Sequence, residues 1–187
     1  MKQLVLQLPS LSRSEPGDWL KSWEQEFGDI VVEQLDWDHP LRGDWQIALQ
    51  EKMWALQDVE HTCAKKFFLI AHGLGCHLVS AWSAHSPHVD WIAGAMLVDP
   101  YDLFGKVDNI KYLSTWIPPM MHKLPFKTCV VTREINQHSS VEGSKSMARC
   151  WGSQYVQLSQ AEGLKPMSLH GAWRELRVIF EQFQTTI

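Results

Sequence analysis

The residues that could do chemistry gather at the end of one short apolar run. Phe67 to Ala71 has the pattern of a buried strand, and it leads directly into His72-Gly73-Leu74-Gly75. A strand, a sharp turn and a helix in this order are the setting of the G-x-S-x-G motif, whose serine is a nucleophile. Here the pattern is Ala71-x-Gly73-x-Gly75, so a glycine stands at the serine position. Because glycine has no side-chain atom that can attack a carbonyl, covalent catalysis by this residue is excluded.

One side chain next to this turn could replace the missing nucleophile. Cys76 lies in the first turn of the helix that follows Gly73, where the positive end of a helix lowers the pKa of a thiol. His77 is its neighbour, but successive side chains point to different sides of a helix. A packed, unreactive cysteine is the ordinary alternative. The chain has no C-x-x-C pair, so we expect reduced thiols rather than a disulfide framework.

Apolar runs alternate with helical patterns along the chain, and this order decides where Gly73 lies. The alternation predicts right-handed β-α-β crossovers and a mostly parallel sheet covered on both faces. Ligands bind beyond the carboxyl ends of the strands in such sheets, and the turn at Gly73 lies at such an end. We find no internal repeat or linker, so residues 1–187 should form a single domain. The predicted strands cover residues 4–8, 30–32, 67–71, 92–98, 128–131 and 155–158, and the predicted helices 19–27, 45–56, 74–83, 141–151 and 173–183.

The composition excludes several classes of protein. The chain has 187 residues, of which 45% are hydrophobic and 20% charged, an ordinary balance for a globular domain and unlike that of a disordered chain. Its net charge of −4 argues against nucleic-acid binding, which needs clustered Lys and Arg. The apolar stretches are much shorter than the roughly 20 residues of a membrane helix, and the N-terminus has no signal-peptide pattern. We therefore expect a cytoplasmic protein that binds neither membranes nor nucleic acid.

Metal and acid–base sites have weaker support. His85-Ser86-Pro87-His88 contains the only close histidine pair, and no Asp or Cys follows it at zinc spacing. Asp36 and Asp38 flank Trp37 and could pair as general acid and base, although anchoring of a loop beside Pro40 is the simpler role. We expect no metal and no cofactor.

Several motifs along the chain belong together. They are Ala71-His72-Gly73-Leu74-Gly75, Asp36-Trp37-Asp38-His39-Pro40 with Asp44-Trp45, Ala93-Gly94-Ala95-Met96-Leu97-Val98, Trp151-Gly152 and His170-Gly171-Ala172-Trp173. The set resembles the small single-domain serine hydrolases related to retinoblastoma-binding protein nine, members of the α/β-hydrolase superfamily, in which the first motif is G-H-S-L-G. The resemblance covers nearly the whole chain. It implies an α/β-hydrolase fold: a three-layer α/β/α sandwich with a mostly parallel central sheet and no large lid domain.

The resemblance also implies where a catalytic triad would lie. The nucleophile position is Gly73, the acid position, counted back from Trp151-Gly152, is Asn136, and the base position ahead of His170 is Gly163. The nucleophile and the imidazole are thus absent, and an amide at the acid position favours the wrong histidine tautomer. All three triad positions are degenerate.

A ligand-binding cleft over the turn follows from the same resemblance. Ser10 stands within Pro9-Ser10-Leu11, where relatives have P-G-L, and it lies at the expected mouth of the cleft. His170 is the histidine nearest the base position, so Ser10 or Cys76 with His170 could form a replacement constellation. A loop hydroxyl that satisfies backbone groups is the ordinary alternative for Ser10. The expected lining of the cleft is Ser10, Leu11, His72, Gly73 and Leu74.

Three functions agree with these residues. The first is a pseudo-hydrolase that binds a small molecule or a protein partner. The second is an active hydrolase of small acyl esters that uses Cys76 or Ser10 with His170. The third is a structural subunit that pairs with an active paralogue through a tryptophan-rich surface. We expect a monomer or a homodimer.

Overall fold

One six-stranded sheet forms the centre of the computed structural model, in the order β2-β1-β3-β4-β5-β6 with every neighbouring pair parallel. The structure describes residues 4–11, 19–57, 66–104, 111–133, 139–158 and 169–187; for residue 111 and residues 169–173 it describes the backbone alone. The strands are β1 (Leu4–Leu8), β2 (Ile30–Val31), β3 (Phe67–His72), β4 (Ile92–Val98), β5 (Lys127–Arg133) and β6 (Gln154–Leu158).

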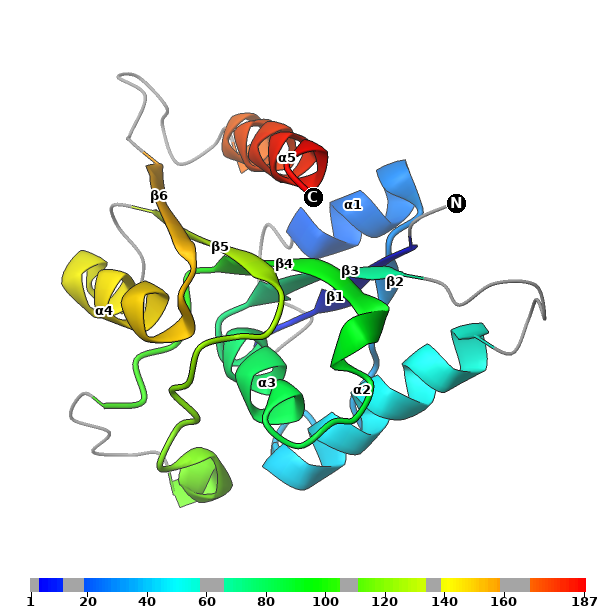
Figure 1. The fold of residues 1–187 in the computed structure, drawn as a ribbon, viewed down its shortest axis with the longest axis vertical. Coiled ribbons are helices and arrows are strands. Elements are labelled where there is room, and N and C mark those ends of the chain that lie inside the picture. The colour runs from blue at the N-terminus through cyan, green and yellow to red at the C-terminus, as the bar shows by residue number, and fades with distance from the viewer. Residues whose placement is uncertain (1–3, 12–18, 58–65, 105–110, 134–138, 159–168) are drawn as a thin grey trace.

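Helices cover both faces of this sheet, as Figure 1 shows. One face carries α1 (Trp19–Phe27) and α5 (Leu169–Thr185), and the other carries α2 (Arg42–Gln57), α3 (Leu74–Ser83) and α4 (Val141–Trp151). Two short 3-10 helices, Val89–Trp91 and Lys111–Trp116, complete the described elements. The predicted three-layer α/β/α arrangement is confirmed. None of the described helices combines the length and the apolar character needed to cross a bilayer.

Strand β3 shows why the sheet must be covered on both sides. Phe67 and Leu69 are fully buried in the core on the α2–α3–α4 face, whereas Phe68 and Ile70 are fully buried in the core on the α1–α5 face. On the second face the ring of Phe68 meets that of Phe180 edge-on, with centroids 5.9 Å apart. A strand that is apolar on both faces is typical of the middle of a parallel sheet.

Some elements are longer than predicted, because groups distant in the sequence stabilise their ends. Helix α2 begins at Arg42, ahead of the predicted N-cap Asp44, and the Arg42 N–H donates a hydrogen bond to Thr115 Oγ1 over 3.1 Å. Strand β5 runs on to Arg133, which pairs with Leu158 of β6. Local patterns contain no information about such partners.

Most tryptophans belong to the core. Trp45 is buried, and its ring meets those of Trp37 and Trp116 edge-on, at 5.5 and 5.4 Å. Among the tryptophans whose side chains the structure describes, Trp54 alone is exposed. The described part of the chain therefore does not present the tryptophan-rich surface that a paired subunit would need.

The register of the strands determines which residues meet at their carboxyl ends. Ser10, Gly73 and Asp99 each follow one of three neighbouring strands within two residues, so the sheet brings them to one place. The adjacent pairs that fix this register are Leu8 with Ala71, His72 with Val98, and Val98 with Val131.

Candidate functional site

The turn between β3 and α3 has the backbone of a nucleophile elbow. Gly73 is the N-cap residue of α3, with φ +55° and ψ −114°. Its N–H donates to the carbonyl of Val98 over 3.1 Å, and its carbonyl accepts hydrogen bonds from the N–H groups of Cys76 and Tyr101, both over 3.2 Å. A positive φ is strained for residues with a Cβ atom and unstrained for glycine. The turn keeps its shape without the serine that usually occupies it.

Ser10 fills the place of the missing side chain. A Cβ atom added to Gly73 would overlap the Oγ of Ser10 and lie 2.8 Å from its Cβ. Cβ atoms in proteins essentially never approach heavy atoms this closely, so residues 10 and 73 cannot both carry side chains without a shift. Ser10 is only 4% exposed. Its hydroxymethyl group therefore occupies the space from which a nucleophile would act.

The same hydroxyl also accepts a hydrogen bond from the backbone of α3. The N–H of Leu74 donates a hydrogen bond to Ser10 Oγ over 3.3 Å. In G-x-S-x-G hydrolases, the N–H of the residue after the nucleophile is one of the two donors that stabilise the oxyanion. The equivalent donor here faces a side chain of the protein itself.

A second glycine lets the end of β1 come this close. A Cβ atom on Gly75 would overlap the carbonyl oxygen of Leu8 and lie 3.0 Å from that of Pro9. The segment Leu8–Ser10 therefore passes directly over the first turn of α3, and we call it the β1 strap. Glycine is needed at position 75 for this close approach of two backbones.

Cys76 is held inside the structure. Its side chain is fully buried, and its Sγ lies 3.5 Å from the carbonyl oxygens of both Ala71 and Val98. Burial raises the pKa of this thiol well above its ordinary value, and the charge of Asp99 raises the pKa further. The prediction that the helix dipole lowers this pKa is therefore wrong. Burial destabilises the thiolate by more than the helix dipole stabilises it.

His77 is buried on the same helix and is also uncharged. Its Nε2 lies 2.6 Å from the carbonyl oxygen of Tyr101, and its ring meets that of Trp151 edge-on at 5.6 Å. Burial lowers the pKa of His77 to about 4. The Nε2 atom must carry the proton to donate to a carbonyl. This histidine therefore links α3 to the segment after β4.

Sequence reasoning missed one pair of charged residues at the carboxyl edge. Asp99 follows β4 with φ 44° and is fully buried. Its Oδ1 accepts the backbone N–H of Arg133 over 2.9 Å, and its Oδ2 pairs with the Arg133 Nε over 2.5 Å. An acidic residue one place beyond a buried strand was the available signal. Both carboxylate oxygens accept from Arg133, so the pair joins the ends of β4 and β5.

The remaining elbow residues divide by burial. Gly73 and Leu74 are buried with Ser10, whereas Leu11 and His72 are partly exposed. The ring of His72 meets Trp19 of α1 edge-on, with centroids 6.0 Å apart. The structure therefore brings the expected cleft residues together, but the β1 strap covers the centre of the group.

Other predicted positions lie outside the described residues. Asn136 and Gly163, the acid and base positions, are among them. His170 lies in the first turn of α5, but its side chain is not described. The positions of these three residues relative to Ser10 remain predictions from the sequence.

The aspartate pair anchors a loop. Asp36 Oδ1 accepts hydrogen bonds from the N–H groups of Asp38 and His39, over 2.8 and 2.9 Å. The Asp36 carbonyl accepts from the indole of Trp45 over 3.3 Å. The backbone hydrogen bond from His39 holds the pKa of Asp36 below its ordinary value. These contacts favour loop anchoring over acid–base catalysis.

The two histidines of the His85–His88 segment lie beside aromatic and loop residues. His88 stacks on Trp91 with ring centroids 4.2 Å apart. Within the described ranges, no three residues among His, Cys, Asp and Glu lie close enough together to hold a metal ion.

Comparisons with solved structures agree on the fold. A YdeN-like hydrolase from Pectobacterium atrosepticum is 20% identical, with a TM-score of 0.68 over 97% of this chain and 92% of that one. The ydeN gene product of B. subtilis is 17% identical, with a TM-score of 0.62 over 97% and 100%. Est1E from Butyrivibrio proteoclasticus, solved with ferulic acid bound, is 11% identical, with a TM-score of 0.72 over 100% and 90%. At these identities the likeness shows the α/β-hydrolase fold alone.

Comparison of the sequence itself gives the family. No curated protein matches the chain. The family model described as serine hydrolase matches residues 5–182, which include all of β1 but its first residue, the strands β2 to β6, the elbow and most of α5. The chain therefore belongs to the serine hydrolase family.

Proposed function

We propose that this member of the serine hydrolase family is a pseudo-hydrolase, which keeps the fold without acyl transfer and acts by binding a small molecule or a protein partner. One observation carries the proposal: the side chain of Ser10 fills the space over Gly73 and accepts the hydrogen bond of Leu74 N–H. A substrate carbonyl placed for attack needs both that space and that donor. The elbow is occupied by the protein's own chain.

The predicted acid and base positions support the same conclusion. Asn136 and Gly163 provide neither the carboxylate nor the imidazole that activates a nucleophile. An oxyanion hole and substrate binding alone accelerate acyl transfer by roughly 10³–10⁴ over water, well below the rate of a working hydrolase. The proposal includes two further expectations. The chain is related to the small hydrolases of the retinoblastoma-binding protein nine group, and it is located in the cytoplasm.

An active hydrolase that uses Ser10 is the second candidate. The position of Ser10 Oγ beside the vacant nucleophile position favours this function. However, an attacking Ser10 would itself occupy the Leu74 N–H that should receive the oxyanion. Cys76 is a poorer nucleophile still, because the raised pKa keeps its buried thiol protonated at neutral pH.

The test combines a fluorophosphonate probe with a p-nitrophenyl ester assay. The proteins compared are the wild type, Gly73→Ser, and Gly73→Ser combined with Ser10→Gly. The double variant exchanges the two residue types, so it relieves the clash over the elbow while restoring the serine. We expect no labelling of the wild type and no turnover above about 10⁴ over water in any variant, because the base and the acid are missing. Melting temperatures confirm that each variant is folded.

Two results would contradict the proposal in different ways. Labelling of the wild type that Ser10→Ala or Cys76→Ala abolishes would establish a replacement nucleophile. Strong turnover by the Gly73→Ser and Ser10→Gly combination would show that a working base and acid exist elsewhere in the chain. A size measurement in cell extract separates a monomer or homodimer from a complex with an active paralogue.

A further inference from the structure

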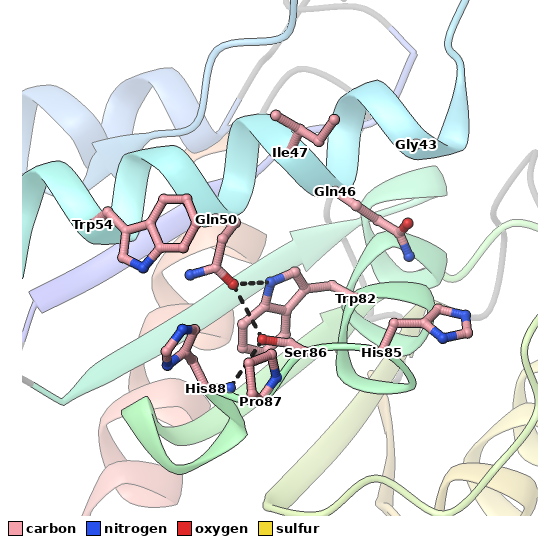
Figure 2. Close-up of a pocket in the computed structure, with 10 residues that line it drawn as sticks. All are labelled: Gly43, Gln46, Ile47, Gln50, Trp54, Trp82, His85, Ser86, Pro87 and His88. Carbon is pink, nitrogen blue, oxygen red and sulfur yellow. Dashed lines mark hydrogen bonds between the residues drawn. The ribbon is translucent and has the colours of Figure 1, made fainter.

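A cavity of about 450 Å³ lies at the end of α3 remote from Gly73. It is formed between α2 and the segment that follows α3, as Figure 2 shows. Because α3 begins at the carboxyl edge of the sheet and runs back along it, this cavity lies away from the elbow. Gly73 is not among the described residues that line it.

Aromatic rings form the main wall of the cavity. Trp54 is 49% exposed, and its ring meets that of His88 edge-on with centroids 6.1 Å apart. His88 stacks in turn on Trp91, which holds the imidazole in place from behind. Trp82 lies on the opposite side and is buried. Large apolar side chains with exposed faces at a concave surface are typical of ligand sites.

One polar group in this wall has no hydrogen-bond partner among the residues that the structure describes. The Gln50 Oε1 accepts a hydrogen bond from the indole of Trp82 over 3.0 Å and another from the hydroxyl of Ser86 over 3.1 Å. These two donors fix the orientation of the amide. Its Nε2 then lies on the side of Trp54 and His88 and, among the described residues, has no acceptor. A buried amide nitrogen without an acceptor is unfavourable. This nitrogen has almost no exposed surface, so a ligand oxygen reaches it only when the side chains around it move apart.

We propose that this cavity binds a flat aromatic molecule that carries a carbonyl oxygen. The ring would pack on Trp54 and His88, and the carbonyl would accept a hydrogen bond from Gln50 Nε2. None of the described residues that line the cavity is a carboxylate that would favour a cationic ligand. The oxygen is the feature that the site recognises, because it supplies an acceptor that none of the described residues provides.

Two probes that differ in the acceptor test the proposal on the wild-type protein. Indole-3-carboxamide has the flat ring and the carbonyl, and 3-methylindole has the ring alone. Binding is followed by NMR through the side-chain amide resonances of glutamine. We expect the carboxamide to bind at least tenfold more tightly, equivalent to about 1.4 kcal/mol, and to shift the amide resonance of Gln50. Equal affinities, or no saturation by either probe at 5 mM, would overturn the proposal.

A matched pair of variants assigns the effect to one atom. Gln50→Glu keeps an oxygen for Trp82 and Ser86 and removes the amide donor, so at pH 8 the carboxamide should bind at least tenfold more weakly and 3-methylindole within twofold of the wild type. Gln46→Glu makes the same change one turn earlier on the same wall and should leave both affinities within twofold. Carboxamide binding that survives Gln50→Glu would exclude the proposed hydrogen bond.

Trp54→Ala tests the aromatic wall separately and should weaken both probes. Unchanged binding of both probes would overturn the ring contact. Ligand binding in this cavity does not depend on whether the elbow is catalytically inactive. Ester turnover at the elbow would contradict the proposed function and leave the cavity unaffected, whereas failure of the probes would remove the cavity and leave the elbow proposal in place.

Discussion

The two ends of helix α3 differ in how their polar groups are satisfied. At the N-terminal end, Ser10 accepts from Leu74 N–H and fills the space over Gly73. At the C-terminal end, the cavity is open, and the Gln50 amide donor beside it has no acceptor among the described residues. The elbow end of α3 is therefore covered by the protein's own chain, whereas the other end borders a cavity. The two proposals made above concern opposite ends of one helix.

The largest expected effect tests how tightly the closed end is packed. In Gly75→Ala, the new Cβ would meet the carbonyl oxygens of Leu8 and Pro9, which are backbone atoms that the sheet holds in place. We expect the free energy of unfolding to fall by about 3 kcal/mol or more, measured by urea denaturation. Gly43→Ala is the matched control, because nothing lies within 4 Å of its added Cβ, and it should leave stability unchanged or slightly raised. A loss below about 1 kcal/mol for Gly75→Ala would show that the β1 strap is loosely held.

The next effect concerns the middle of the helix. His77 has a folded-state pKa of about 4 against an ordinary value of 6.5, because burial disfavours its charged form. Between these values the unfolded chain binds the proton and the folded chain does not, so stability is fully present above pH 6.5 and falls as the pH drops towards 4. The loss should approach about 3 kcal/mol.

A comparison of variants isolates this contribution. Unfolding free energies are measured from pH 7.5 to 4 for the wild type, His77→Gln and His39→Gln. The pKa of Asp29 is raised by burial, which works in the opposite sense, but it is common to all three proteins. The pH dependence should flatten in His77→Gln and persist in His39→Gln, because His39 has a side chain 78% exposed. Parallel curves for all three would show that His77 is not the group responsible.

The smallest effect is expected at the open end. Trp54 is 49% exposed on α2, so Trp54→Ala should lower the free energy of unfolding by about 1–2 kcal/mol, less than either effect above. The wild type and the variant can be compared by thermal denaturation. A large loss would mean that Trp54 is part of the core, and the contrast between a packed end and an open end would then disappear.

The sequence predicted the layers of the fold better than the state of the site. Alternating strands and helices are encoded in local patterns, and the parallel sheet was therefore predictable. Gly73 stands at the N-cap of α3 with a positive φ, at the turn where the sequence pattern places it, and its role as a degenerate nucleophile position stays a prediction. The positions of Ser10 and Gly75 relative to each other were not predictable, because they depend on the alignment of Leu8 with Ala71 across the sheet.

Long-range burial accounts for the other differences. Cys76 has the sequence context of an activated thiol, but the pKa depends on how much water remains around the sulfur. The Asp99–Arg133 pair joins residues far apart in the chain through the ends of β4 and β5. His88 was considered as part of a metal motif, whereas the structure places it against Trp54 and Trp91.

The β1 strap has a consequence for which residues the elbow can accept. Any side chain at position 73 would bring its Cβ within 2.8 Å of the Ser10 Cβ, so the strap would have to shift to admit it. A glycine at position 10 would remove that obstacle. The residue types at positions 10 and 73 are therefore coupled through space, although 63 positions separate them in the sequence.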